Sequence, residues 1–469
     1  MSLKTAKIAA RTFVLVAATL MATPAQFGAV QAAQATVSPG TQLWVGRYND
    51  SPNDGFVATS VAVSPDGNEV YVTGSNNQGV TYKFVTVAYN ASGQQLWATP
   101  FAVAAGDQPN KVAVSPDGKT IYVEGFTGSA SDADYVTIAY DAATGNQKWA
   151  RTYNGSAKGN DEAMGMAVNQ TSGNVYVTGE SQAAAGGYQF ATVAYSPSGT
   201  KLWAQLFSDA TPAADYATSI AVNSKTGVVY VSGQSGFNGT LEYATEAISS
   251  AGKKLWVKHY NGPGTGTDSA QAVAVSPATG DVFVTGFSYG GATNYDYATV
   301  AYSASGTQLW AKRYARSGSG NDFATSVAVN ASGSAVYVTG RSLAPNNQYD
   351  YVTVAYSATG AKQWLKTYNG PAGANADDEA VAVAVNQSTG NVYVTGESDN
   401  NTHLGYDYAT IDYSPAGAVL WTSRYAAPSA INNRPHALAI NPVTGVVYVT
   451  GSSGNNAGEY DYATVAYAP

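Results

Sequence analysis

Eight tryptophans recur along the chain at nearly constant intervals, and this periodicity restricts the possible folds more than any other feature. The chain has 469 residues, and successive tryptophans are 52 to 57 residues apart. The series comprises Trp44, Trp97, Trp149, Trp203, Trp256, Trp310, Trp364 and Trp421. A fixed period of this length indicates one supersecondary unit that is repeated along the chain.

Each repeat also contains four short segments rich in Val, Thr and Tyr. In the repeat that begins at Trp310, these segments cover residues 309–314, 324–329, 336–340 and 350–356. Alternating β-branched and aromatic residues, bounded by turns of Gly, Asn and Ser, are typical of strands. Four antiparallel strands per unit and eight units predict an all-β fold, the eight-bladed β-propeller.

The two ends of the repeat region are incomplete in complementary ways. Residues 43–48 have the pattern of a fourth strand without the preceding three, whereas residues 460–467 form a third strand with no fourth after it. We therefore expect the two fragments to complete one blade and to close a single propeller over residues 41–469. Two four-bladed rings, or an open array, would leave the fragments unmatched.

The first 35 residues have the features of a secretory signal peptide and a short leader. Lys4, Lys7 and Arg11 precede an apolar run over residues 13–22, and small residues follow it. A membrane-spanning helix needs about 20 apolar residues, so a transmembrane anchor is the weaker interpretation. No later stretch is long enough either. We therefore expect a secreted or cell-surface protein without a transmembrane segment.

Composition excludes several functional classes. The chain has no Cys, which excludes disulfide scaffolds, thiol enzymes and metal sites with Cys ligands. The net charge of -8 disfavours nucleic acid as a partner. Only 12% of the residues are charged, against about 25% in ordinary soluble domains. A chain built of strands and tight turns has little helical surface to fill with charged residues, which accounts for the low fraction. We also expect the protein to be a monomer.

Residues 392–396 (Val-Tyr-Val-Thr-Gly) and residues 140–149 resemble the bacterial β-propeller repeat family often called SBBP. They also resemble the tryptophan-docking motif of quinoprotein-like propellers. The resemblance covers nearly the whole chain after the leader and implies that each Trp packs between neighbouring blades. A large side chain at one fixed strand position agrees with that role; a ligand-stacking platform is the alternative. Quinoprotein enzymes carry an adjacent-cysteine disulfide that is impossible here, so we expect no pyrroloquinoline quinone and no other organic cofactor.

Turn lengths distinguish two faces of the predicted propeller. Turns between first and second strands, such as residues 64–68, and between third and fourth strands, such as 303–306, are short and contain Gly. The other connections, such as residues 370–377 and 399–406, are longer and irregular. Both long kinds open on the same side of a four-stranded blade. Variable loops on a rigid scaffold usually carry function, so this side is the predicted functional face.

An aspartate recurs on that face, directly before or at the start of the first strand. It is present in six repeats, as Asp107, Asp161, Asp215, Asp268, Asp322 and Asp378. If the first strands are innermost, these carboxylates ring the mouth of the central channel and could hold Ca²⁺, which takes several oxygen ligands. The alternative is that each Asp accepts backbone N–H bonds within its own turn. Recurrence in six repeats favours this structural role, and the metal ligands stay unassigned.

The acidic pattern is broken near the junction of the first and last repeats. Lys83 stands where other repeats have Asp, and Arg434 and His436 lie in a first strand that lacks the Asp. Together with His403 from a long loop, they could form a cationic patch for a carboxylate or sulfate group of a glycan. Sequence drift in the terminal repeats is the alternative.

Two classes of function remain. The first is a non-enzymatic propeller that binds a glycan, a protein or another cell-wall component through its variable face. The second is an extracellular polysaccharide lyase or hydrolase, in which a His or Lys would take a proton beside a uronate neutralised by Arg. The second rests on analogy with other propellers. Convergence of Lys83, Arg434, His403 and His436 would distinguish it from the first.

Overall fold

The computed structural model describes residues 37–469 apart from a few loop segments. These segments are residues 51–54, 79–80, 103–105, 129–130, 210–212, 238–239, 317–319, 372–376, 400–404, 428–431 and 456–458. The predicted signal peptide, residues 1–35, lies outside the described residues, and so does His403. Regular secondary structure in the described part consists of strands, and none of its segments is a helix that could cross a membrane.

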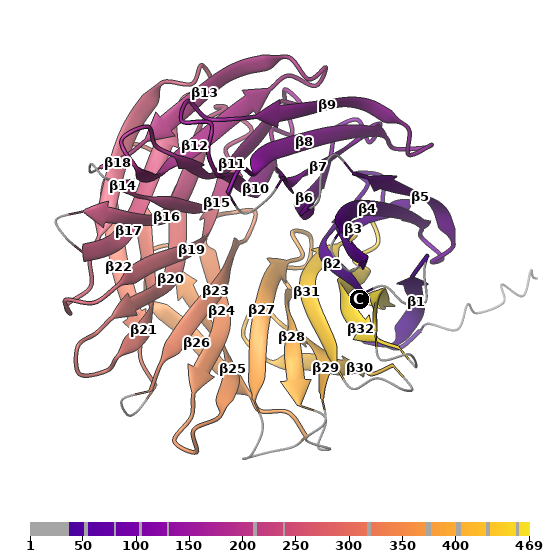
Figure 1. Cartoon of the computed structure of the whole chain (residues 1–469). Helices are drawn as coiled ribbons and strands as arrows, with labels where there is room; N and C mark the ends of the chain where they lie inside the picture. Colours follow the sequence, from indigo (N-terminus) through magenta and orange to yellow (C-terminus); the bar gives the residue numbers. More distant parts are fainter. Residues whose placement is uncertain are drawn as a thin grey trace, which may run out of the picture. The chain divides into compact units, whose positions relative to one another are not determined.

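The described strands form eight separate antiparallel sheets, each with four strands in sequence order apart from the short extra strand β14. Figure 1 shows these sheets as blades arranged around a central axis. The prediction of an eight-bladed β-propeller with four-stranded blades is therefore confirmed. We number the blades from 1 to 8 in the sequence order of their first strands, β2 to β31.

Blades 1 to 4 are built from β2 to β18. Blade 1 comprises β2 (Gly55–Val63), β3 (Glu69–Gln78), β4 (Thr81–Asn90) and β5 (Gln95–Phe101). Blade 2 comprises β6 (Gln108–Val114), β7 (Thr120–Thr127), β8 (Asp134–Asp141) and β9 (Gln147–Tyr153). Blade 3 comprises β10 (Asp161–Val168), β11 (Val175–Gln182), β12 (Gly187–Tyr195), β13 (Lys201–Phe207) and β14 (Ala213–Ala214). Blade 4 comprises β15 (Tyr216–Val222), β16 (Val229–Phe237), β17 (Thr240–Ile248) and β18 (Lys254–Tyr260).

Blades 5 to 8 follow the same plan, and the last one takes its fourth strand from the start of the chain. Blade 5 comprises β19 (Asp268–Val275), β20 (Val282–Tyr289), β21 (Tyr295–Tyr302) and β22 (Gln308–Tyr314). Blade 6 comprises β23 (Asp322–Val329), β24 (Ala335–Leu343), β25 (Tyr349–Ser357) and β26 (Lys362–Tyr368). Blade 7 comprises β27 (Asp378–Val385), β28 (Val392–Asp399), β29 (Tyr406–Tyr413) and β30 (Val419–Tyr425). Blade 8 comprises β31 (Asn433–Ile440), β32 (Val447–Gly454), β33 (Tyr460–Tyr467) and β1 (Gln42–Tyr48).

Blade 8 closes the ring as the complementary ends predicted. Strand β1 pairs antiparallel with β33, so that Trp44 lies opposite Ala466 and Tyr48 opposite Tyr462. In Figure 1 the yellow C-terminal strands accordingly lie beside the indigo strand β1. Hydrogen bonds cross the next interface too, because the Tyr462 hydroxyl donates to the carbonyl of Val85 in blade 1, at 3.3 Å.

The glycine that recurs in the middle of each second strand has a local cause. The first strand of every blade contains a β-bulge, which in blade 6 lies between Ala324 and Ser326. The bulge brings the carbonyl of Phe323 against Gly340, where any Cβ would collide with it. Only glycine tolerates such a close backbone approach, so the repeat has Gly at this position.

The tryptophans pack between blades. Trp310 belongs to blade 5. Its ring centre lies 5.9 Å from that of Phe283 in the same blade and 5.7 Å from that of Tyr356 in blade 6. Its Nε1 donates to the carbonyl of Ala358, also in blade 6, at 2.8 Å. Six other tryptophans make the equivalent bond to the following blade, namely Trp44, Trp97, Trp149, Trp203, Trp256 and Trp364. This repeated contact joins consecutive blades, and it occupies the rings that a ligand platform would need.

Candidate functional site

The first strands line the central channel, and both kinds of long connection open on one side, which we call the loop face. A cavity of about 360 Å³ in the channel is lined by residues of all eight first strands, from Ser60 in blade 1 to Leu438 in blade 8. The sequential strand order places the fourth-to-first and second-to-third connections at the same end of each blade. The predicted functional face is thus a real surface of the fold.

The six recurrent aspartates do not form a solvated ring at the channel mouth. Each is 0–1% exposed. Their carboxylates instead accept hydrogen bonds from the loop that enters the blade and from its second strand. In blade 5, for example, Asp268 accepts from the backbone N–H of Gly262 and of Tyr289, both at 2.9 Å. This corrects the predicted acidic ring: the carboxylates turn into their own blades because buried backbone N–H groups there need acceptors.

Burial affects the ionisation of these groups. Desolvation raises the pKa of Asp268, and it raises that of Asp378 to about 6. Asn433 fills the same place in blade 8, where it accepts from Ser453 at 2.6 Å. In blade 8 an amide thus takes the place of the acid as acceptor, and in blade 1 the buried Phe56 stands there, so the position does not require a charge.

The second recurrent aspartate, at the start of the third strand, binds arginine in four blades. The ion pairs are Asp296–Arg313 at 2.8 Å, Asp350–Arg316 at 2.5 Å, Asp407–Arg424 at 3.0 Å and Asp461–Arg47 at 2.7 Å. Its fifth member, Asp134, has a pKa raised by burial and by the nearby Asp161. These aspartates therefore also hold strand ends together.

The basic candidates Lys83, Arg434 and His436 lie on strands of blades 1 and 8. Arg434 turns towards blade 7, where its Nε lies 3.1 Å from Glu397 and its guanidinium stacks 5.2 Å from the ring centre of Tyr406. His436 lines the channel cavity, and Lys83 lies on β4 of blade 1. Arg434 is thus already paired with an acid, although its charge also reaches His436 on the same strand, and the cationic patch of these residues with His403 stays a prediction.

Arg434 also belongs to a row of rings and charges that follows the loop-face end of blades 5 to 7. The rings of this aromatic row are Phe287, Tyr289, Tyr295, Phe323, Tyr349 and Tyr406, and all are partly exposed. Phe287 lies 5.3 Å from Tyr295 and 5.2 Å from Phe323 of the next blade. Ring centres at these separations make favourable edge-to-face contacts, which hold the rings in place.

Two arginine–glutamate pairs continue the aromatic row. The guanidinium of Arg341 lies 5.0 Å from the ring centres of both Phe323 and Tyr349, and it binds Glu379 at 2.5 Å. Glu397, which lies opposite Glu379 across β27 and β28, binds Arg434. The row thus ends in two ion pairs whose acids lie side by side, in the order Arg341, Glu379, Glu397 and Arg434.

The aromatic row was missed in the sequence, although one signal for it was present. A tyrosine directly precedes the second recurrent aspartate in four consecutive repeats, as Tyr295, Tyr349, Tyr406 and Tyr460. Backbone bonds fix three of these positions to the following blade; the N–H of Tyr349, for instance, donates to Asp377 at 2.8 Å. Arg341 gives no repeat signal, because no other blade has Arg at its position.

In blade 3, the positions of Glu379 and Glu397 hold a second pair of acids, Glu162 and Glu180. No ion pair to either is found among the described residues. Desolvation and the charge of Glu162 raise the pKa of Glu180 to about 7. Tyr188 and Tyr216 lie beside this pair with ring centres 5.5 Å apart. Among the described residues, no group of three or more acids or histidines could hold a metal ion.

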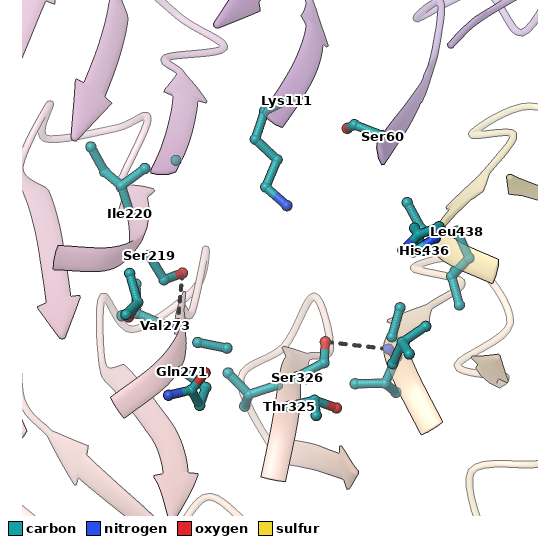
Figure 2. Close-up of a pocket in the computed structure, with 18 of the residues that line it drawn as sticks. Ser60, Lys111, Ser219, Ile220, Gln271, Val273, Thr325, Ser326, His436 and Leu438 are labelled. Atoms are coloured by element: carbon teal, nitrogen blue, oxygen red, sulfur yellow. Dashed lines mark hydrogen bonds between the residues drawn. The ribbon is translucent and has the colours of Figure 1, made fainter. Parts of the chain in front are cut away.

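The channel cavity has a different character (Figure 2). Lys111 extends into it from β6, with Ser60 and His436 on one side and Ser219 and Gln271 on the other. His436 faces the channel. Desolvation by the surrounding atoms and the positive charge of Arg434 lower the pKa of its imidazole to about 4. His436 is therefore neutral near pH 7. None of the sequence arguments had selected Lys111.

Comparison with protein families supports the repeat assignment. A family model described as outer membrane protein assembly factor BamB matches residues 26–248, slightly less than half of the chain. This match supports a β-propeller with quinoprotein-type repeats, while the SBBP type stays a prediction. No curated protein matches the sequence.

Solved structures agree on the fold. Sqt1 from Chaetomium thermophilum is similar to this chain with a TM-score of 0.58 and 11% identity, over 92% of this chain and 98% of that one. Sqt1 from Saccharomyces cerevisiae gives 0.56 and 9%, over 92% and 100%. C. thermophilum Sqt1 bound to the N-terminus of ribosomal protein L10 gives 0.58 and 10%, over 92% and 100%. At these identities the likeness concerns architecture alone, and the chain is an eight-bladed β-propeller.

Proposed function

We propose that this protein is a secreted or cell-surface propeller that binds a neutral polysaccharide along the loop face of blades 5 to 7 and the adjoining edge of blade 8. The aromatic row is the observation that supports this function. The C–H face of a sugar ring packs well on an aromatic ring, and the hydroxyl groups around it bond to polar side chains at the edges. A chain of repeated sugar units suits rings that recur from blade to blade.

The charges of the row favour a neutral polysaccharide over an acidic one. Arg341 and Arg434 each have a glutamate partner, and the chain as a whole carries a net charge of -8, which repels polyanions. The two arginine side chains are nevertheless 37% and 48% exposed. Arginine has five N–H donors, so donors remain for sugar hydroxyl groups.

Retention of the purified protein on neutral glucans, mannans and chitin tests the proposal, with a uronate-containing and a sulfated polysaccharide as separate arms. Tyr349→Ala and Tyr406→Ala should each weaken binding of the neutral ligand about tenfold, a loss of about 1.4 kcal/mol. Tyr188→Ala is the matched control, because Tyr188 has the same strand position in blade 3. This control should bind as tightly as the parent.

Three results would overturn the proposal. The first is that no polysaccharide is retained, and the second is that Tyr188→Ala loses as much affinity as Tyr349→Ala. The third is binding of a protein ligand that competes with nothing in the polysaccharide panel and is lost in Tyr349→Ala. That result would assign the aromatic row to a protein partner.

Glycan hydrolysis is a second candidate, and the Glu162–Glu180 pair favours it. A carboxyl group with a raised pKa beside a second carboxylate is what acid–base cleavage of a glycosidic bond requires. Glu180, with its pKa near 7, would be the acid and Glu162 the base or nucleophile. Release of reducing ends from the polysaccharides above, abolished in Glu180→Gln but retained in Glu397→Gln, would establish it; no release would exclude it for these substrates.

A further inference from the structure

Blade 2 departs from the repeat at two positions that face each other across β6 and β7. The first-strand position that lines the channel holds a small residue in seven blades, namely Ser60, Gly165, Ser219, Ala272, Ser326, Ala382 and Ala437. In blade 2 it holds Lys111. The paired second-strand position is Thr or Ser in the other blades and Glu124 in blade 2. Both exceptions fall on one pair, which suggests one joint role.

Glu124 occupies a place that the repeat uses for a buried hydroxyl pair. In blade 6, Thr339 and Thr353 share a hydrogen bond of 3.0 Å there. Glu124 is 0% exposed, and neither of its carboxylate oxygens has a hydrogen-bond partner among the described residues. Burial raises the pKa of Glu124 to about 8, against a smaller opposing effect of Lys111. The carboxyl group is therefore mostly protonated near pH 7.

Lys111 consequently brings an unbalanced positive charge into the channel. Its Nζ is not within ion-pair distance of Glu124 or of another described acid, and it points towards the middle of the cavity in Figure 2. Of the residues that line the cavity, Lys111 and His436 are the titratable ones, and His436 is neutral. Lys111 is exposed within the channel, so its ammonium group is accessible to an anion that enters the cavity.

Three of the hydroxyl groups that line the cavity are held in place by the following blade. Ser60, Ser219 and Ser326 each accept the backbone N–H of a valine in the following blade, at 3.2, 3.2 and 3.3 Å. An oxygen that is fixed as an acceptor in this way leaves its own proton for another partner. The rest of the wall is mixed: polar side chains such as Thr218, Gln271 and Thr325 alternate with aliphatic ones such as Ile220, Val273 and Leu438.

We propose that the central channel binds a small organic anion whose carboxylate or phosphate oxygens contact the Lys111 ammonium and the serine hydroxyls. The cavity volume of about 360 Å³ lies in the range of small-molecule sites. One ammonium group favours a ligand with a single anionic group, the aliphatic side chains of the wall can pack against a short carbon skeleton, and the polar ones can bond to its hydroxyl groups. This site is separate from the aromatic row, so it stands or falls independently of polysaccharide binding.

Ligand-dependent thermal unfolding of the full protein tests this site. Acetate, lactate, gluconate and phosphate are compared with chloride at equal ionic strength and pH 7. At least one of the organic anions should raise the melting temperature of the parent more than chloride does, because a ligand that binds the folded state stabilises it. The comparison of the carboxylates with phosphate identifies the preferred group, and calorimetric titration then gives the affinity.

Variants of Lys111 separate a binding site from a structural role. Lys111→Ser restores the residue of blades 1, 4 and 6 and should weaken anion binding at least about tenfold. Lys111→Arg keeps the charge and should retain binding. The double variant Lys111→Ser with Glu124→Thr restores the repeat at both positions and secures a folded protein that should not bind. Lys225→Ser, on an exposed turn, is the matched control and should bind like the parent.

Two results would overturn the proposal. If no anion stabilises the parent more than chloride, the channel has no such site. If anion stabilisation persists unchanged in the double variant, the anion binds elsewhere. In either case Lys111 and Glu124 would have a structural role alone. Lys111→Ser would then change the stability of the protein without changing its response to any anion.

Discussion

Arg47 and Asp461 form an ion pair of 2.7 Å although they are 414 positions apart in the sequence. Arg47 also donates to the hydroxyls of Tyr425 and Ser453, both at 3.0 Å. Three other blades contain an arginine that binds the second recurrent aspartate, but only here does the pair join the two ends of the described chain. An ion pair that stabilises single blades elsewhere therefore stabilises the closure of the ring in blade 8.

Arg47→Ala should destabilise the fold by about 2 kcal/mol, because it leaves the largely buried Asp461 without its ion-pair partner. The matched control, Arg313→Ala, breaks the equivalent pair within blade 5. Both should lower the melting temperature, but only Arg47→Ala should speed amide hydrogen exchange in β1. Unchanged exchange over residues 42–48 would contradict the assigned role in closure.

The tryptophans allow a comparison that isolates one hydrogen bond. Trp310 and Trp421 are both 8% exposed, but Nε1 of Trp421 has no acceptor among the described residues. Trp310→Phe should therefore cost about 1 kcal/mol more than Trp421→Phe, because it alone leaves a carbonyl, that of Ala358, without its donor. Urea unfolding of both variants measures the difference, and equal losses would show that the bond contributes nothing.

Asp268→Ala should lower stability by about 2 kcal/mol, since the backbone N–H groups of Gly262 and Tyr289 lose their acceptor. Asp268→Asn keeps an acceptor oxygen and should cost less, as Asn433 in blade 8 suggests. Thermal unfolding with Ca²⁺ and with a chelator completes the test. A Ca²⁺-dependent melting temperature that Asp268→Asn abolishes would restore the cation-binding interpretation.

Stability should fall as the pH rises from 5 to 8. The pKa of Glu124 is raised to about 8, and those of Glu180, Glu246 and Asp412 to about 7, mainly by desolvation. The folded state then holds protons that the unfolded chain has released above about pH 4.5, so stability present at low pH is lost on the way to pH 8. One such proton contributes at most about 1.4 kcal/mol per pH unit.

Glu124→Gln should flatten this pH profile, because glutamine does not titrate. Urea unfolding of parent and variant at intervals between pH 5 and 8 gives the two slopes. Glu69→Gln, at a half-buried strand end, is the control variant that removes a different carboxyl group. Parallel profiles for the parent and Glu124→Gln would mean that the buried carboxyl does not hold a proton.

The fold was predictable because the same pattern of four strands recurs eight times in the sequence. Each strand pattern is short and ambiguous alone, but the constant spacing of Trp and the complementary ends leave one arrangement that pairs every strand. The direction of a side chain at a strand end is a different matter. Whether Asp268 faces the channel or its own blade depends on the bulge and on the donors that burial leaves unpaired, and a sequence does not display either.

The candidate sites were less predictable for a related reason. Arg434 was selected from the sequence, but its partners Glu397 and Tyr406 come from another repeat, and only the packing of blades brings them together. Lys111 and Glu124 could have been found, since each departs from the repeat at one of two positions that pair across neighbouring strands. Departures at single positions are ambiguous, whereas paired departures indicate a shared role.

The pairing of β1 with β33 has a consequence for how the protein assembles. Bringing together segments about 410 residues apart in a flexible chain costs on the order of 5 kcal/mol of entropy. Blades that stack one on another, each touching its neighbours, remove that freedom step by step before the ends meet. The angle between neighbouring blades thus determines how many blades close the ring. Strand β1 reaches β33 only when all the blades have stacked, and a chain that lacked one blade would leave the edges of both strands unpaired.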